Sequence, residues 1–176
     1  MGSAMVPGEI LFSADQIAQR VTELAAEIRR DFQGRRLTIV GILRGGIYFL
    51  TDLVRQLGPD ACLELVEAAS YGERTASSGQ VMLRRYGQLD VRGRDVLLVD
   101  DIADTGHTLA AVRRAVEAMA PASVRICVLL DKPARRQAAV IPDYCGFVVD
   151  NVFVVGYGLD YAGQYRALPY ISGLAE

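Results

Sequence analysis

The sequence lacks any long hydrophobic run. Its apolar stretches are only a few residues long and are broken by charged residues or glycine, whereas a helix that crosses a membrane needs about 20 apolar residues. We therefore expect a soluble chain with no membrane partner. The first five residues contain neither a basic residue nor a long apolar segment, so they resemble a cloning remnant more than a secretory signal. This favours a cytoplasmic location.

Cysteine is scarce as well. The three cysteines, Cys62, Cys127 and Cys145, are odd in number, far apart and without C-x-x-C spacing. This pattern argues against a disulfide framework and against a zinc site. We predict that all three are buried, reduced thiols.

Neither sign of charge is in large excess. The chain has 19 basic and 21 acidic residues, for a net charge of −2, so it has no general attraction to nucleic acid. Its arginine pairs, such as Arg135-Arg136, are scattered along the chain and are typical of solvated faces. Any anion site must therefore be local, and we expect no nucleic-acid partner.

The sequence does contain enough apolar residues for one core. Of its 176 residues, 51% are hydrophobic and 23% are charged, with no low-complexity tract. This composition is typical of one globular domain. We predict a single domain over residues 6–176.

Hydrophobic periodicity predicts alternating helices and strands. The first helix begins with a capping-box signal at Ser13 and Gln16. The expected helices run from this cap to Gly34, over residues 47–57 and over 108–120; the expected strands cover 37–43, 62–68, 96–99, 123–130 and 152–157. This order predicts an α/β fold with a mostly parallel, twisted sheet and helices on both faces. Ligands then bind beyond the carboxyl ends of the strands.

The segment that follows strand 96–99 carries the clearest chemistry. Asp100 and Asp101 come at the carboxyl end of this strand, where paired carboxylates accept hydrogen bonds from ribose hydroxyls and help to hold a metal ion. Residues 104–108, Asp-Thr-Gly-His-Thr, then open a helix whose backbone N–H groups and dipole converge on one point. Either half alone is also typical of an ordinary strand end or helix cap. Together they indicate a phosphate site.

In this order the motif resembles the phosphoribosyl pyrophosphate site of the type I phosphoribosyltransferases. Asp104 favours the hypoxanthine-guanine branch, in which an aspartate at this position acts as general base. The resemblance covers nearly the whole chain, through residues 43–46 (Leu-Arg-Gly-Gly), 70–72 (Ser-Tyr-Gly), 131–136 (Asp-Lys-Pro-Ala-Arg-Arg) and 153–161 (Phe-Val-Val-Gly-Tyr-Gly-Leu-Asp-Tyr). Asp100 departs from the pattern, because that branch usually has glutamate there. The resemblance also implies a small hood formed by the chain ends.

The resemblance implies a role for each site residue. Ribose and phosphoribosyl pyrophosphate would contact Asp100, Asp101, Asp104, Thr105, Gly106, His107, Thr108, Arg44, Gly45 and Arg166, with a cis peptide possible at Arg44-Gly45. The purine would contact Lys132, Phe153, Val154 and Asp160, and Mg²⁺ would be held by Asp160, Asp100 and Asp101. His107 would contribute its backbone N–H and turn its side chain to solvent. The polar segment 70–80, beginning at Ser70 and Tyr71, would be a flexible lid.

Each of these side chains also has an ordinary alternative. Lys132 would otherwise be a solvated lysine, Phe153 a core phenylalanine, and Asp160 and Arg166 members of surface salt bridges. Chemically, the Lys132 ammonium has only donors, so it favours a 6-oxo over a 6-amino group.

The implied reaction joins hypoxanthine or guanine to phosphoribosyl pyrophosphate, giving the nucleoside 5'-monophosphate (IMP or GMP) and pyrophosphate, in a homodimer or homotetramer. The rival interpretations are a transferase for xanthine, adenine or a pyrimidine, and an RNA-binding pyrimidine regulator built on the same fold. The net negative charge argues against the regulator.

Overall fold

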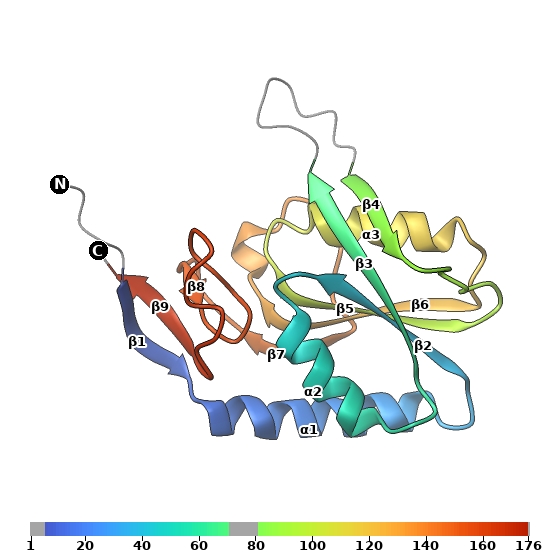
Figure 1. Ribbon diagram of the computed structural model, residues 1–176, viewed down its shortest axis with the longest axis horizontal. Helices are drawn as coiled ribbons and strands as arrows, with labels where there is room; N and C mark the ends of the chain where they lie inside the picture. Colours follow the sequence, from blue (N-terminus) through green and yellow to red (C-terminus); the bar gives the residue numbers. More distant parts are fainter. Residues whose placement is uncertain (1–5, 71–80, 176) are drawn as a thin grey trace.

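The computed structural model describes residues 6–70 and 81–175. Its main sheet has six strands in the order β4-β3-β2-β5-β6-β7 (Figure 1). These are β2 (Leu37–Leu43), β3 (Cys62–Ser70), β4 (Val81–Tyr86), β5 (Asp95–Ala103), β6 (Ser123–Asp131) and β7 (Tyr144–Val148). Only the β3–β4 pair is antiparallel among these neighbours. The predicted α/β class with a mostly parallel sheet is confirmed.

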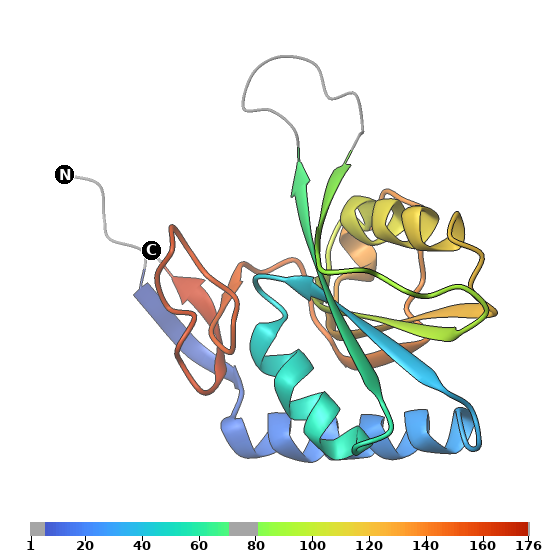
Figure 2. The same ribbon diagram turned by 45° about the vertical axis from the view of Figure 1, so that its right-hand side comes forward.

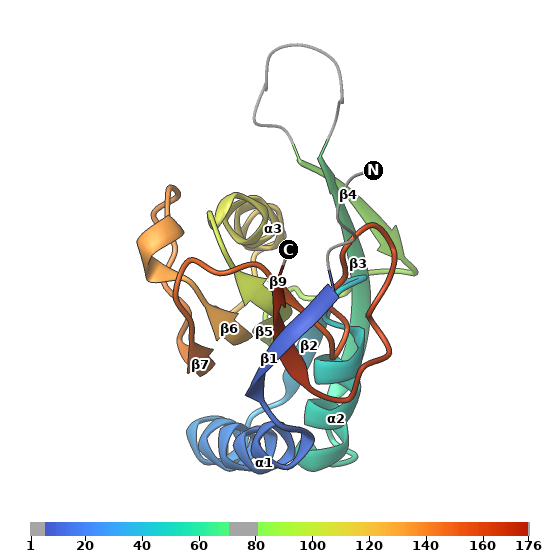
Figure 3. The same ribbon diagram turned by 90° about the vertical axis from the view of Figure 1, so that its left-hand side faces the viewer.

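Helices cover both faces of this sheet, as the alternation predicted. The helices α1 (Ala14–Asp31) and α2 (Ile47–Leu57) lie on one face, and α3 (His107–Glu117) lies on the other (Figure 3). The apolar side chains form one core cluster on the α1 and α2 side and a second on the α3 side. The Ser13 capping box begins α1, with the Gln16 N–H donating to Ser13 Oγ at 3.2 Å.

The chain ends form a separate antiparallel sheet. It contains β1 (Val6–Phe12), β9 (Ile171–Ala175) and β8 (Val154–Val155), with β9 in the middle. Figure 2 shows this hood on the side toward which β2 points. The predicted strand 152–157 is therefore wrong in length and partner, because only Val154 and Val155 form a strand, and they pair with β9. Their neighbours turn away at Gly156, whose φ is 99°.

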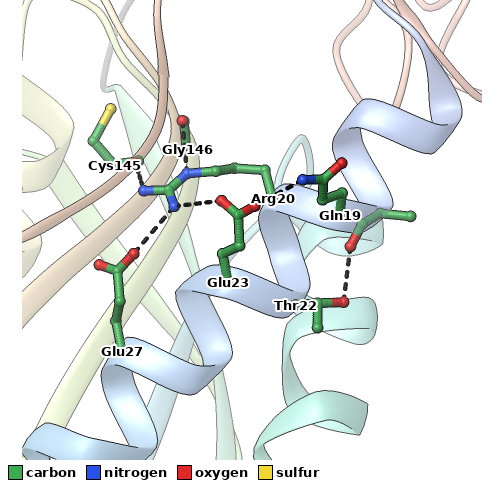
Figure 4. A network of polar contacts seen from close by, with 8 residues as sticks. Gln19, Arg20, Thr22, Glu23, Glu27, Cys145 and Gly146 are labelled. Carbon is green, nitrogen blue, oxygen red and sulfur yellow. Dashed lines mark hydrogen bonds and ion pairs between the residues drawn. The ribbon is translucent and has the colours of Figure 1, made fainter.

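Arg20 of α1 forms hydrogen bonds with the edge strand β7. Its guanidinium donates to the carbonyl oxygens of Gly146 at 3.0 Å and Cys145 at 2.9 Å, while Glu23 and Glu27 hold the same group from α1 (Figure 4). Carbonyl groups at a sheet edge otherwise have no strand partner. The contact therefore covers part of that edge.

The three cysteines are free thiols, as predicted. Of the three, only Cys127 is buried, so the prediction of burial was wrong for Cys62 and Cys145, which are partly exposed. These two lie in β3 and β7, at or next to the edges of the main sheet. Burial raises the pKa of Cys127, and raises that of Cys145 to about 11. Among the described residues, no helix is both long and apolar enough to cross a membrane.

Candidate active site

The site begins where the strand order changes direction. After β2 the chain continues to β3 on one side of the sheet, whereas after β5 it continues to β6 on the other. The loops beyond these two adjacent strands therefore diverge and leave a crevice at their carboxyl ends. A pocket of about 230 Å³ occupies this place, lined by Ile42, Leu43, Gly45, Ala68, Asp100, Asp101, Ile102, Asp104, Thr105, Gly106, Thr108 and Leu109.

The turn 104–106 joins β5 to α3 at this pocket. Gly106 precedes the helix with a φ of 84°, a left-handed conformation that favours glycine. The first backbone N–H groups of α3 have no partner within the helix and attract anions. The His107 side chain is exposed, as predicted, with Nε2 3.1 Å from Gln137 Oε1. The turn is therefore suited to binding an anion.

Asp100 and Asp101 lie together at the pocket floor. The Asp101 N–H donates to Asp100 Oδ1 at 3.0 Å, and the Ile102 N–H donates to Asp101 Oδ1 at 2.8 Å. Burial raises the pKa of Asp100 well above its usual value, and the neighbouring Asp101 adds to this effect. Burial also raises the pKa of Asp101. Two adjacent carboxylates of this kind, that of Asp100 buried and that of Asp101 partly exposed, are suited to a cation or to hydroxyl donors.

The loop 44–46 closes the other side of the crevice. A Cβ added to Gly45 would lie 1.7 Å from Asp101 Oδ2, and one added to Gly158 would lie 2.0 Å from the Gly45 carbonyl oxygen. Gly158 therefore needs to be glycine, because its Cβ would meet backbone and its φ is 102°, whereas Gly45 leaves room for the Asp101 carboxylate. A cis peptide bond joins Leu43 to Arg44. The expected position was one bond later, between Arg44 and Gly45. A cis bond outside proline has no residue signature in a sequence, so its position needed the structure.

A second pocket adjoins the first and gathers the residues expected around a purine. It has a volume of about 240 Å³ and is lined by Gly45, Asp101, Ile102, Asp104, Lys132, Phe153, Val154, Leu159, Asp160 and Arg166. Gly45, Asp101, Ile102 and Asp104 line both pockets. One wall comes from β5 and the loops that follow β2, β5 and β6, and the other comes from residues 153–166, which include β8.

The burial of Lys132 and the exposure of Phe153 argue against the alternative interpretations as a solvated lysine and a core phenylalanine. Lys132 is only 6% exposed, and its Nζ donates to the Val152 carbonyl oxygen at 2.7 Å, so it is not a solvated lysine. Burial lowers the pKa of its ammonium, although Asp104 opposes the shift. Phe153 is 51% exposed and meets the ring of Tyr161 edge-on at 5.7 Å, so it is not a core residue. Its ring is available for stacking.

Asp160 and Arg166 form an ion pair with each other at the pocket wall. Arg166 Nη2 lies 2.6 Å from Asp160 Oδ1, and Nη1 donates to the Gly158 carbonyl oxygen at 2.6 Å. Asp160 Oδ2 accepts from the Gly163 N–H at 2.8 Å. Asp160 and Arg166 do form a salt bridge, as the alternative interpretation required. Both residues nevertheless line the candidate site. Each Asp160 oxygen keeps a second lone pair, so the carboxylate could also contact a metal ion.

Two arginines that the sequence grouped with solvated faces contact the site. Arg135 Nε donates to Asp104 Oδ1 at 2.5 Å, and Arg136 Nη1 donates to the Asp104 carbonyl oxygen at 2.7 Å. Arg136 also pairs with Asp131. Their signal in the sequence was their position three and four residues after Lys132, inside a segment that already pointed to the site. Tyr71 lies outside the described residues, as does nearly all of the expected lid, and the Ser70 side chain is not described.

The carboxylates present fit a magnesium ion shared with a substrate. Within residues 6–70 and 81–175, no group of three or more His, Cys, Asp or Glu side chains could hold a metal ion alone. Mg²⁺ usually binds through one or two carboxylates together with substrate phosphates and water. Asp100 and Asp101 supply such a pair, and the absent Cβ of Gly45 leaves room for the Asp101 carboxylate.

Comparison with known proteins identifies the family. The model of the phosphoribosyl transferase domain matches residues 8–162. The chain belongs to the phosphoribosyltransferase family. The match includes the turn 104–108, Lys132, Phe153 and Asp160, so it covers the lining of both pockets except Arg166.

Two relatives show which members of the family the chain resembles. The chain is 41% identical over 168 residues to the hypoxanthine-guanine phosphoribosyltransferase of Streptococcus pneumoniae, covering 96% of this chain and 93% of that protein. It is 42% identical over 164 residues to the bifunctional protein TilS/HprT of Listeria innocua, covering 93% of this chain. The chain spans about a quarter of that bifunctional relative.

A solved structure confirms the fold. The hypoxanthine phosphoribosyltransferase of Staphylococcus aureus superposes with a TM-score of 0.90 at 36% identity, covering 96% of this chain and 92% of that one. The fold is therefore that of a type I phosphoribosyltransferase, hood included.

Proposed function

We propose that the protein transfers a phosphoribosyl group from 5-phosphoribosyl 1-pyrophosphate to a 6-oxopurine, hypoxanthine or guanine, in purine salvage. The observation that carries this proposal is the buried Lys132 ammonium beside the exposed Phe153 ring, in a pocket that adjoins the phosphate turn. The names of the relatives support the same reaction.

Lys132 selects the purine by its donors. An ammonium has three N–H donors and no acceptor, so it binds a 6-oxo oxygen and confronts the amino group of adenine with a second donor. Phe153 stacks on the ring, and the Val154 backbone binds the purine edge. Because Lys132 is buried, water competes poorly for this contact.

The neighbouring pocket binds the activated sugar. The turn formed by Thr105, Gly106, His107 and Thr108 binds the 5-phosphate, and Asp100 and Asp101 accept from the ribose hydroxyls. Arg44 and Gly45 contact the pyrophosphate from the opposite loop. Arg166 lies across from them, and its planar guanidinium matches two phosphate oxygens.

The proposed chemistry places the acidic residues in separate roles. Mg²⁺ held by Asp100, Asp101 and Asp160 would neutralise the charge that develops on the pyrophosphate. Purine N9 bonds to ribose C1 as the bond from C1 to pyrophosphate breaks, and Asp104 takes the proton from N7. A lid over 70–80 would exclude water from the activated sugar.

A base panel with an Asp104→Asn variant tests this function. With phosphoribosyl pyrophosphate and Mg²⁺, we expect hypoxanthine or guanine to be consumed and adenine to be left, measured by absorbance, with xanthine included as the rival substrate. Asp104→Asn should lower kcat by about 10²- to 10⁴-fold, because it removes the base, with KM little changed.

Asp90→Asn provides the matched control, since Asp90 also pairs with an arginine, Arg94, and lines neither pocket in the part of the chain that the structure describes. Full turnover in the Asp104→Asn variant would remove the base assignment, and a preference for adenine would overturn the function. Salt-sensitive retention of RNA on a filter, without base consumption, would favour the regulator instead.

We further propose that the protein is cytoplasmic and forms a homodimer or homotetramer. Light scattering of the purified protein tests the oligomeric state.

A further inference from the structure

We propose that Arg135 is a positioning residue that orients the carboxylate of Asp104 for proton transfer. This inference rests on the proposed role of Asp104 as the base. Arg135 comes from the short 3-10 turn η1 (Pro133–Arg135) after β6, and Asp104 comes from the turn after β5. Their side chains meet through the 2.5 Å bond from Nε to Oδ1.

The backbone around Asp104 is fixed without the Arg135 side chain. The Lys132 N–H donates to the Ala103 carbonyl oxygen at 3.0 Å, and the N–H groups of Gln137 and Ala138 donate to the Thr105 carbonyl oxygen at 2.9 and 3.0 Å. Arg136 holds the Asp104 carbonyl oxygen. The main freedom left to Asp104 is therefore rotation of its own side chain.

Arg135 restrains that rotation. Its Nε holds Asp104 Oδ1 while Nη1 donates to Asn151 Oδ1 at 3.1 Å, so one guanidinium bridges the turn of the base and the segment leading into Phe153. A carboxylate has two oxygens, and fixing Oδ1 leaves Oδ2 as the oxygen that takes the N7 proton. General-base catalysis requires hydrogen-bond reach to the proton, so a fixed orientation raises turnover.

The bridge contributes more to orientation than to stability. The side chains of Arg135 and Asp104 are 43% and 38% exposed, and ion pairs with this exposure stabilise a fold little. Arg135 does not line the purine pocket, whereas Asp104 does. Its loss should therefore reduce turnover without weakening substrate binding.

The test compares Arg135→Met and Arg135→Gln with the wild type and with Arg113→Met. Arg113 is a matched control, because its Nε makes the same contact with a carboxylate, Glu117 Oε1 at 2.8 Å, on the exposed side of α3. We expect kcat to fall about tenfold in both Arg135 variants, with KM for hypoxanthine and for phosphoribosyl pyrophosphate within about twofold. Arg113→Met should keep the wild-type kcat, and all variants should keep the wild-type unfolding midpoint.

The double variant Asp104→Asn/Arg135→Met separates positioning from a structural role. If Arg135 acts through Asp104, adding Arg135→Met to Asp104→Asn should lower kcat by less than about twofold. An equal tenfold loss in both backgrounds, an unchanged kcat in Arg135→Met, or a rise in KM alone would each overturn the inference. A wild-type rate in Asp104→Asn would instead overturn the proposed base, so the two failures are distinguishable.

Discussion

At the residue scale, burial distinguishes Lys132 from an ordinary surface lysine. It is the single lysine among the 19 basic residues of the chain, all the others being arginine. A guanidinium is larger and holds its charge under almost any burial, whereas an ammonium is compact and loses its proton more readily. Burial lowers the pKa of Lys132 accordingly. The position therefore suits a point donor in a small pocket.

Replacing Lys132 by Met should weaken purine binding specifically. The change removes a charged hydrogen bond, which contributes about 1.5–3 kcal/mol, so KM for hypoxanthine should rise about 10- to 100-fold. KM for phosphoribosyl pyrophosphate should stay near the wild-type value, because the phosphate turn is unchanged. Steady-state kinetics with each substrate varied in turn measures both. An equal rise in the two KM values would contradict the assignment.

At the element scale, the end of α1 is held to the sheet by a polar cluster. Asp31 at the end of the helix accepts from Arg125 Nη1 of β6 at 2.8 Å and from the Tyr144 hydroxyl of β7 at 2.8 Å. Arg125 also donates to the Tyr144 oxygen at 2.7 Å. Burial and the bond to Asp31 raise the pKa of Tyr144 to about 12. The cluster therefore requires a neutral tyrosine.

This requirement predicts a loss of stability at alkaline pH. The folded pKa of about 12 lies above the unfolded value near 10, so Tyr144 contributes its full stability below pH 10 and loses it as pH rises toward 12. Between pH 9 and 11 the loss should reach about 1 kcal/mol. Denaturant unfolding at pH 9 and pH 11 measures this loss. Between these pH values, the free energy of unfolding should fall by about 1 kcal/mol less in Tyr144→Phe than in the wild type. Tyr48→Phe, an exposed tyrosine of α2, is the control, and an unchanged fall in Tyr144→Phe would contradict the explanation.

At the scale of the whole molecule, the site exists only where the hood meets the main sheet. Gly158 of the hood side approaches the Gly45 carbonyl so closely that no Cβ fits. Nearby, the Tyr157 hydroxyl donates to Asp52 of α2 at 2.6 Å, and burial raises the pKa of that hydroxyl. These contacts hold Phe153 and Asp160 opposite Asp101 and Asp104.

Because the metal would be shared with the substrate, its removal should affect activity and not folding. EDTA should abolish transfer, and excess Mg²⁺ should restore it, while the unfolding midpoint without substrate should move by less than about 1 °C. Phosphoribosyl pyrophosphate with Mg²⁺ at about 100 times its Kd should add about 2.7 kcal/mol, or roughly 5–10 °C. Thermal unfolding by fluorescence measures these shifts. A large drop in the midpoint with EDTA alone would indicate a structural metal instead.

The elements with strong local patterns were predictable from the sequence. The capping box at Ser13, the apolar run of β2 and the apolar start of β5 each specify their element through local propensity and periodicity. The turn 104–108 was predictable for the same reason, because strand, acidic pair and helix start are contiguous. The strands β1, β4, β7 and β9 were not predicted, since each is short or mixed in polarity and depends on a distant partner.

The sequence by itself determined the mostly parallel sheet and the turn between β5 and α3, because these features lie in contiguous segments whose patterns act locally. It also named most residues that line the two pockets, whose roles stay predictions. Only the tertiary structure decided that Lys132 is buried, that Phe153 is exposed, and that Arg135 reaches Asp104 across 31 residues of chain. Burial and long-range contacts depend on how separate segments pack, and no local pattern records that packing.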